Sequence, residues 1–168
     1  MALEIVEERV DTPIGEVSVF TSPKGVCRIT FGGSADAGET LGQRFAGVPI
    51  VRRPVRSEAA QALDRYFGGD LHSLDDVTVD VIGTVFQQHV WQVLRSIAPG
   101  HTFSYGDVAS KVGQPRGFRA VGMANRSNPV PLVIPCHRVI ASDGSLGGYS
   151  PGVDLKVWLL RHEGYLLT

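Results

Sequence analysis

The sequence predicts an α+β protein with two domains, a mixed α/β domain at the N-terminus and a mostly helical domain at the C-terminus. Two short apolar runs joined by a turn lie between Ile14 and Phe31, which is typical of a β-hairpin. After Thr84, apolar residues recur instead at helical spacing. The two patterns meet near Ile82-Gly83, so we divide the chain into residues 1–82 and 83–168.

The N-terminal half is interpreted as a hairpin, a helix and one further strand. The hairpin consists of Ile14–Phe20 and Val26–Phe31, and a loop follows over residues 32–38. A helix is expected over Ser57–Phe67, because its first residue can act as an N-cap and two glycines follow its last. Apolar and polar residues alternate over Val77–Val81, which predicts a strand.

The C-terminal half opens with a longer helix. Thr84 and Gln87 have the spacing of a capping box, in which two side chains satisfy backbone N–H groups at a helix start. Val90 and Leu94 continue at helical spacing, and Pro99 ends the pattern. The helix is therefore expected to begin at the boundary between the two domains.

Two short helices then predict a helix-turn-helix. They cover Ser104–Val112 and Gly117–Ser127, and a Gly/Pro turn at Gly113–Pro115 joins them. Asp143–Ser145 is a turn that suits a small wing. A final amphipathic helix is expected over Val153–Glu163.

Charge is distributed unevenly along the chain, although the net charge is only −1. Residues 1–84 contain eight basic and thirteen acidic side chains, whereas residues 85–168 contain eight basic and four acidic ones. This asymmetry indicates either a half that binds a polyanion or a solvated basic face. Between Val108 and Ser142 there is no acid, and the basic residues are Lys111, Arg116, Arg119, Arg126 and Arg138.

Other function classes are disfavoured by composition. The N-terminus carries acids where a signal peptide needs bases, and the most apolar stretch, Val130–Ile134, is too short to cross a bilayer. We therefore expect a cytoplasmic protein without a membrane partner. Cys27 and Cys136 are expected to be free thiols, although the sequence alone leaves a disulfide open. Without a CxxC motif or paired histidines, we expect no metal and no cofactor.

The segment that carries candidate chemistry is rich in proline. Three prolines within residues 129–135 fix the backbone and remove N–H donors, so the segment cannot be an ordinary central strand. We interpret it as a rigid arm that presents Cys136. A lone cysteine is usually a small buried hydrophobic residue. However, His137 and Arg138 follow directly, and a neighbouring base or cation activates a thiol as a nucleophile.

Pro135-Cys136-His137-Arg138-Val139, preceded by Asn128-Pro129-Val130-Pro131, resembles the active-site signature of the O6-alkylguanine-DNA alkyltransferases, above all of their bacterial members. The resemblance covers residues 84–166, whereas the first half fits the family only in outline. It implies a ribonuclease H-like N-terminal domain and a winged helix-turn-helix C-terminal domain. Further matching motifs, in the same order along the chain, are 103–109, 118–122, 148–150 and 156–164.

The resemblance implies catalytic roles for five residues. Cys136 would attack the alkyl carbon on guanine O6, and His137 would remove the thiol proton through a water molecule. Glu163 would orient His137, as the third member of a hydrolase triad does. Asn128 would brace the turn that bears the cysteine. Tyr105 would donate its hydroxyl proton to the base, since a neutral leaving group departs more readily than an anion.

The resemblance also implies contacts with the substrate and with DNA. The Ser150 N–H would bond O6, backbone around Cys136 and Val139 would hold the exocyclic amine, and Tyr149 lies in the same loop. A stacked guanine must be extruded before reaction, and Arg119 would fill the space. Small residues on the recognition helix would permit approach to the minor groove. The DNA-contacting residues implied in this way are Tyr105, Gln114, Arg119, Ala120, Gly122, Arg126 and Ser142.

The expected function is therefore DNA repair by irreversible, single-turnover transfer of an alkyl group to Cys136. The expected partner is double-stranded DNA with an alkylated guanine, bound by a protein that is monomeric in solution. Larger alkyl groups, O4-alkylthymine and cooperative binding along DNA stay open. Two other interpretations also stay open, a cysteine hydrolase that uses Cys136 with His137, and a DNA-binding module in which Cys136 only packs.

Overall fold

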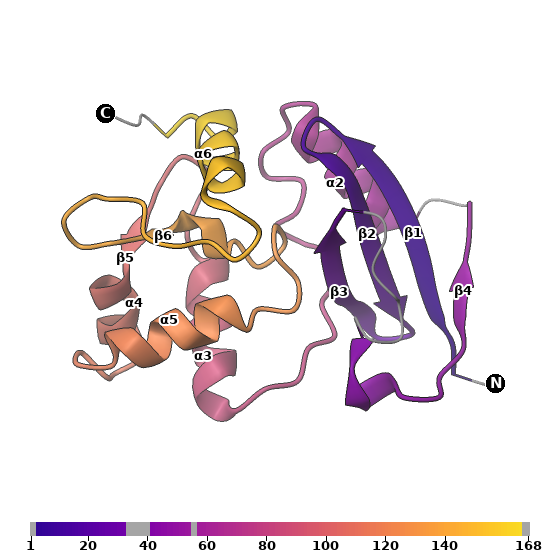
Figure 1. Ribbon diagram of the computed structural model, residues 1–168, viewed down its shortest axis with the longest axis horizontal. Coiled ribbons are helices and arrows are strands. Elements are labelled where there is room, and N and C mark those ends of the chain that lie inside the picture. The colour runs from indigo at the N-terminus through magenta and orange to yellow at the C-terminus, as the bar shows by residue number, and fades with distance from the viewer. Residues whose placement is uncertain (1–2, 33–40, 55–56, 166–168) are drawn as a thin grey trace. The chain divides into compact units, whose positions relative to one another are not determined.

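The computed structural model describes residues 3–32, 41–54 and 57–165, and the chain divides into two compact units, 1–81 and 82–168 (Figure 1). The first unit is a sheet with one α-helix, and the second is mostly helical, so the predicted α+β class is confirmed. Most of the loop predicted over residues 32–38 lies outside the described residues.

The N-terminal unit is built on a four-stranded sheet with the order β3-β2-β1-β4. The predicted hairpin is confirmed as β2 and β3, whereas β1 and β4 were not predicted. In β1, the consecutive acids Glu7 and Glu8 are both buried, so neither polarity nor burial alternates there as in a half-buried strand. The elements of the sheet and its short connection are β1 (Ile5–Thr12), β2 (Gly15–Ser22), β3 (Gly25–Phe31), the 3₁₀ helix η1 (Gln43–Phe45) and β4 (Ile50–Arg52).

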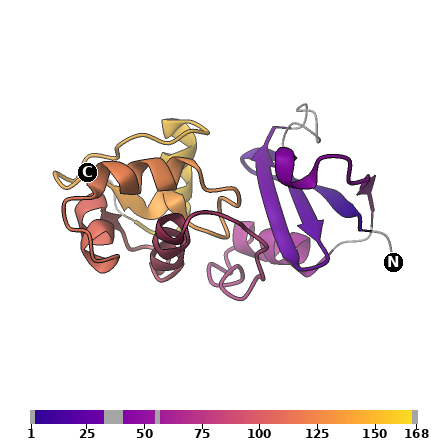
Figure 2. The ribbon, with the colours of Figure 1, turned by 90° about the horizontal axis from the view of Figure 1, so that it is seen from below.

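The predicted helix of this unit is α2 (Glu58–Phe67), which packs against the sheet beside β1 (Figure 2). Ser57 is its N-cap, and the Ser57 hydroxyl accepts a hydrogen bond from the Ala60 N–H at 3.2 Å. The buried Glu8 carboxylate accepts a second bond, from the Ser57 N–H at 2.8 Å. The first bond caps the helix, and the second fixes its first turn relative to β1.

The strand predicted over Val77–Val81 is wrong. The segment makes a single parallel bridge, Val26 to Val79, and no ladder follows. Arg44 binds both the backbone carbonyl of Asp80, at 2.9 Å, and its carboxylate. The Asp80 carbonyl accepts from the Arg44 side chain and not from a neighbouring strand. The alternation of apolar and polar residues over Val77–Val81 therefore does not lead to strand pairing.

The C-terminal unit opens with α3 (Val85–Arg95), whose predicted capping box is present. The Thr84 side chain accepts from the Gln87 N–H, and the Gln87 side chain accepts from the Thr84 N–H. A second predicted pair, Ser104 with Asp107, caps α4 in the same way. The two helices expected after α3 are confirmed as α4 (Tyr105–Lys111) and α5 (Phe118–Arg126), which pack on each other and on α3.

Beyond α5 the chain returns across these helices. The 3₁₀ helix η2 (Cys136–Arg138) contacts α3 on one side and α6 (Val153–His162) on the other (Figure 1). Directly after η2, β6 (Val139–Ile140) pairs in parallel with β5 (Phe103–Ser104). The expected turn at Asp143–Ser145 forms after β6. The cysteine segment is thus held from several sides within one unit.

The N-cap of α2 provides a test of this local analysis. Ser57→Ala should lower the free energy of unfolding of the N-terminal unit by about 1 kcal/mol, because the Ala60 N–H loses its acceptor. Ser57→Asn, which keeps an acceptor, should stay close to the original protein. Urea denaturation followed by far-ultraviolet circular dichroism measures both variants. Equal losses in the two would contradict the assigned cap.

Candidate active site

As predicted, the arm that leads to Cys136 is not a strand, and the structure shows that it is largely buried. Within the described part of the chain, Leu132 of this arm is the non-glycine residue that has a positive φ, 74°. Such a backbone conformation costs energy for a residue with a Cβ atom. Its side chain is buried, so packing holds this backbone in place. The arm contains one isolated bridge, Pro131 to Ile134, and no strand. Cys136 then begins η2, and its N–H bonds the Ile134 carbonyl at 2.8 Å.

Two asparagine side chains fix the two ends of the arm. Asn128 accepts from the Val130 N–H at 2.9 Å and donates to the Ile134 carbonyl at 2.8 Å, so it spans the arm. The buried Asn125, on the inner face of α5, donates to the Cys136 carbonyl at 3.2 Å. Asn125 was not predicted as a site residue. Its contact ties the backbone of the cysteine directly to the second helix of the helix-turn-helix.

The Cys136 thiol is buried, with 5% of the residue exposed, and burial raises its pKa. Hydrogen bonds from the Asn128 and Tyr149 side chains and the positive charge of Lys156 act in the opposite direction without overcoming burial. The resting group is therefore the protonated thiol, which is a weak nucleophile. Chemistry at this sulfur needs a base that takes the proton at the time of reaction.

His137, the residue predicted to act as this base, is completely buried. Its Nε2 lies 2.8 Å from Oε2 of Glu163. A carboxylate only accepts, so the proton of the neutral ring is on Nε2 and the lone pair is on Nδ1. Burial lowers the pKa of His137 and outweighs Glu163, which acts to raise it. The lowered pKa keeps the ring neutral. Nδ1 is also buried and has no hydrogen-bond partner among the described residues, so it is available to accept a proton.

Glu163 is shared by a second cation. Arg138 donates from Nε to Oε1 and from Nη2 to Oε2, both at 2.8 Å, and from Nη1 to the Ile97 carbonyl at 2.6 Å. Burial alone would raise the pKa of Glu163, but hydrogen bonds from Arg138 and His137 outweigh it and hold that pKa well below its usual range. The carboxylate is therefore ionised at neutral pH.

Arg138 is therefore not part of a basic surface. It also does not act on the Cys136 thiol, as its place in the sequence suggested. Each residue of a 3₁₀ helix is rotated by a third of a turn from the one before. Arg138, two residues after Cys136 in η2, therefore points away from the sulfur despite its closeness in sequence. The guanidinium is buried against Glu163 instead. Its role escaped the sequence analysis, which considered only its neighbours along the chain.

Lys156 is the second buried cation that the sequence analysis missed. Its Nζ donates to the Val139 and Leu146 carbonyls at 2.6 Å each and to the Gly148 carbonyl at 3.4 Å. Burial lowers the pKa of Lys156 to about 8. The sequence did contain a sign of this burial, because Lys156 lies three residues before Leu159 and so shares the apolar face of α6. Lys156 holds the loop after β6 close to the strand that follows the cysteine.

Tyr105 is the first residue of α4 and is half-buried. Burial raises the pKa of Tyr105 and outweighs the opposing effect of the Arg126 charge, so the phenol is protonated at neutral pH. Gly147 has φ of 71°, and a Cβ added there would come within 3.2 Å of the Tyr105 hydroxyl. The loop that Lys156 anchors therefore packs closely against this hydroxyl.

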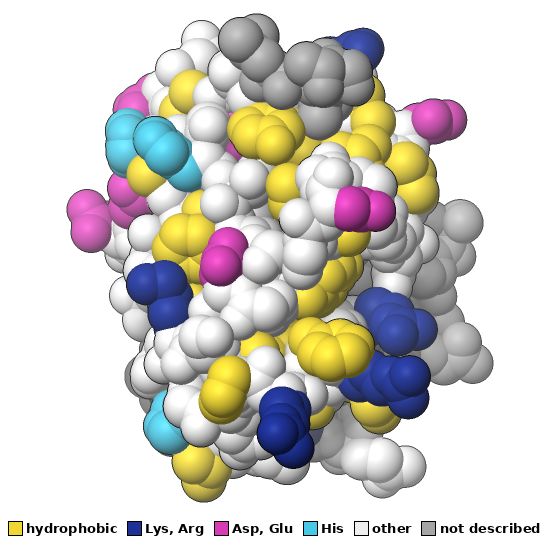
Figure 3. Space-filling model, turned by 90° about the vertical axis from the view of Figure 1, so that its left-hand side faces the viewer, with side chains coloured by type: hydrophobic (Ala, Val, Ile, Leu, Met, Phe, Trp, Pro, Cys, Tyr) yellow, Lys and Arg dark blue, Asp and Glu magenta, His cyan; other side chains and the backbone are white. Residues whose placement is uncertain are grey.

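The remaining predicted residues divide by exposure. Val139 is buried, Tyr149 and Gly122 are half-buried, and Ser150 is exposed at the end of the same loop. In the lower half of Figure 3, at the level of α4 and α5 in Figure 1, the coloured side chains in view are basic, hydrophobic or histidine. The exposed residues predicted to contact DNA are Gln114, Arg119, Ala120, Arg126 and Ser142.

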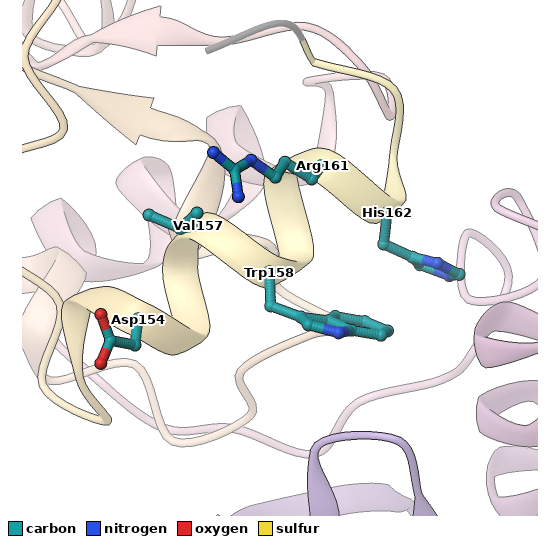
Figure 4. A pocket seen from close by; sticks show the side chains of 5 residues that line it. All are labelled: Asp154, Val157, Trp158, Arg161 and His162. Carbon is teal, nitrogen blue, oxygen red and sulfur yellow. The ribbon is translucent and has the colours of Figure 1, made fainter.

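A hollow on α6 contains none of the predicted site residues. It is lined by Asp154, Val157, Trp158, Arg161 and His162, and the Trp158 and His162 rings stack with centroids 4.9 Å apart (Figure 4). Within the described residues, no group of three or more His, Cys, Asp or Glu side chains is arranged to hold a metal ion. The same residues include no helix long and apolar enough to cross a membrane.

A buried thiol, a neutral imidazole and an ionised carboxylate beside a helix-turn-helix define a protein with a cysteine nucleophile. Residues 85–165 match the family model described as 6-O-methylguanine DNA methyltransferase, DNA binding domain. The chain is 41% identical to the methylated-DNA–protein-cysteine methyltransferase of Salmonella typhimurium, over 98% of this chain and 99% of that protein. It is 39% identical to the Methanosarcina barkeri protein of the same name, over 92% and 94%.

Solved structures agree with these relatives. The crystal structure of Mycobacterium tuberculosis OGT in complex with DNA matches with a TM-score of 0.79 and 34% identity, over 95% of this chain and 93% of that one. The O6-methylguanine-DNA methyltransferase from Pyrococcus kodakaraensis matches with a TM-score of 0.69 and 28% identity, over 95% and 99%. The chain belongs to the methylated-DNA–protein-cysteine methyltransferase family.

The shared carboxylate predicts a large loss of stability on substitution. Glu163→Gln leaves the Arg138 guanidinium buried without a countercharge, which should cost about 3–5 kcal/mol. Arg138→Met in the same chain should recover part of that loss. Trp91 and Trp158, the two tryptophans of the sequence, both lie in the C-terminal unit, so fluorescence during urea denaturation reports on this unit. A loss no larger than that of the exposed Glu58→Gln would contradict the argument.

Burial of neutral His137 predicts a pH dependence of stability. The pKa of His137 is lower in the folded protein than its unfolded value of about 6.5, so the unfolded chain takes up the proton first as pH falls. Stability should therefore decline below about pH 6.5, whereas Glu163, with its depressed pKa, adds a loss only below about pH 4.5. His137→Asn should remove much of the decline between about pH 6.5 and pH 5. Exposed His89→Asn, the control, should keep it.

Proposed function

We propose that this protein repairs DNA by transferring an alkyl group from guanine O6 to Cys136. The observation that carries the proposal is a buried Cys136 thiol followed directly in the chain by a buried His137, whose Nε2 is held by Glu163 at 2.8 Å while Nδ1 is available as a base. The family relationship supports the same reaction. Neither a metal nor a cofactor takes part, because a thiolate displaces an alkyl group without one.

The proposed reaction is an in-line displacement. His137 Nδ1 accepts the thiol proton through a water molecule, and Glu163 stabilises the imidazolium that forms. The thiolate forms a bond to the alkyl carbon while the carbon–oxygen bond breaks, and the electron pair passes to the base. Tyr105, whose raised pKa keeps its hydroxyl protonated, donates a proton to a ring nitrogen. The imidazolium proton then returns through solvent to the tyrosinate, and the products are a thioether on Cys136 and an unmodified guanine.

Recognition of the flipped base is proposed for the loop after η2. The Val139 carbonyl would accept from the exocyclic amine, since Lys156 occupies only one of its two acceptor positions. The Ser150 N–H would donate to O6, and Tyr149 would line the same loop. The Cys136 carbonyl already accepts from both Asn125 and the Val139 N–H. Among these backbone groups, Val139 is therefore the better acceptor for the amine.

The proposed partner is double-stranded DNA with the lesion extruded from the helix. Arg119 would occupy the vacated space, and Arg126, Gln114 and Ser142 would contact phosphates. Ala120 and Gly122 would let α5 approach the minor groove. A Cβ added at Gly122 would meet nothing within 4 Å in the protein, so the fold itself does not require glycine there. The protein would act in the cytoplasm as a monomer, once per molecule, because a thioether is not displaced readily.

Mass spectrometry of the intact protein, after reaction with a duplex containing O6-methylguanine, tests the proposal directly. We expect a gain of one CH₂ unit, located on Cys136 by peptide mapping, with one lesion repaired per molecule. Cys136→Ser should abolish transfer and retain most of the DNA affinity, because the thiol is buried and does not contact the exposed helix face. Repeated turnover, or an unchanged mass on folded and reduced protein, would contradict single transfer to this residue.

A further inference from the structure

The outer face of α5 carries a large apolar side chain that the proposed reaction does not use. Met123 is 68% exposed, whereas Val121, Ala124 and Asn125 on the inner face are buried. The packing of α5 thus depends on these inner residues and not on Met123. A single exposed apolar residue is ordinary by itself, and Met123 differs from such a residue by the side chains that surround it.

Met123 lies between two exposed cations on one stripe of the helix. Arg119, Met123 and Arg126 are related by four and three residues, which places them on the same face. No acidic residue occurs between Val108 and Ser142, and Arg138, which lies in that interval, is buried and paired elsewhere. The stripe therefore combines two positive charges with one protruding apolar side chain. This combination complements duplex DNA, in which charged phosphates surround stacked, largely apolar bases.

Small residues flank the methionine. Ala120 lies on the exposed side of α5, and Gly122, directly before Met123, faces open space in which a Cβ would meet nothing within 4 Å. Gly within a helix costs about 0.5–1 kcal/mol relative to Ala, and no contact inside the protein requires it here. A long side chain thus stands out from a low surface, where a partner can approach the backbone closely.

We propose that Met123 is an apolar wedge that enters the stacked bases from the minor groove and helps to extrude the damaged base. This rests on the proposed function and adds a residue that acts on the DNA and not on the reacting atoms. Proteins that bind the minor groove insert side chains such as Met, Leu or Phe between base steps, partly unstacking them. An unbranched, polarisable methionine suits a gap of irregular shape.

Helix geometry gives the location of this wedge relative to Arg119. Four residues of α-helix rise about 6 Å, and two steps along a DNA strand span roughly 6.8 Å. If Arg119 fills the space of the extruded base, Met123 meets the duplex about two steps along the groove. The two side chains would thus act about two base steps apart, Arg119 replacing the lost stacking partner and Met123 opening the stack farther along the same groove.

A wedge changes extrusion and leaves the chemistry at Cys136 untouched. Its effect therefore depends on whether the substrate is stacked. The rate of alkyl transfer from duplex DNA should fall when Met123 is shortened, because unstacking costs a few kcal/mol per step and loses its compensation. The rate with free O6-methylguanine base should not change, since a free base needs no extrusion.

The test compares Met123→Ala, Met123→Leu and Val85→Ala with the original protein. Val85 is 73% exposed at the start of α3, so its variant is a matched control for loss of surface apolar area outside α5. Rates of Cys136 alkylation are measured with an O6-methylguanine duplex and with the free base. A 2-aminopurine next to the lesion reports unstacking by its fluorescence in a Cys136→Ser background.

We expect Met123→Ala to lower the duplex rate roughly tenfold and the 2-aminopurine signal with it, while the free-base rate stays the same. Met123→Leu and Val85→Ala should remain within about twofold on both substrates. A duplex rate unchanged in Met123→Ala, or an equal loss on duplex and free base, would overturn the wedge alone. Failure of the original protein to alkylate Cys136 with either substrate would overturn the proposed function, and the wedge with it.

Discussion

The carboxylate of Glu163 receives hydrogen bonds from both His137 and Arg138 in the interior of the C-terminal unit. Removing the ionised Glu163 and Arg138 from water costs several kcal/mol each, and the bidentate geometry between them offsets that cost only while both partners are present. Because Glu163 is the C-cap of α6 and both partners belong to η2, this arrangement also joins the last helix to the segment that carries the cysteine. Structural and chemical requirements therefore coincide at one residue.

This constraint explains how a buried thiol can remain unreactive until a substrate arrives. Burial raises the pKa of Cys136 and lowers that of His137, so the resting pair is neutral on both sides. Moving a proton from one to the other creates a thiolate and an imidazolium together, and the anionic Glu163 favours the latter. In the proposed reaction the ion pair would form only when it is used, and until then the thiol stays protonated and is a weak nucleophile.

Local chemistry along the sequence was sufficient for the elements with their own signals. The hairpin and both capping boxes depend on residues within a few positions of each other, and they form as predicted. The strand β1 was missed and the strand at Val77–Val81 was wrongly predicted, in both cases because of contacts between residues far apart in the sequence. Buried Glu8 of β1 binds Ser57, and Arg44 binds Asp80. Arg138 and Lys156 were missed likewise, because their partners lie 25 and 17 residues away.

The two faces of α5 perform different tasks in the same short helix. Its inner face holds the cysteine, through the Asn125 side chain on the Cys136 carbonyl, and its outer face presents Arg119 and Arg126 to the surroundings. A change on the inner face alters the position of the nucleophile, whereas a change on the outer face alters only what the helix meets. Because the packing of α5 depends on its buried inner residues and not on its exposed outer ones, the two faces can be altered separately, and a substitution on the outer face should preserve the geometry of the thiol.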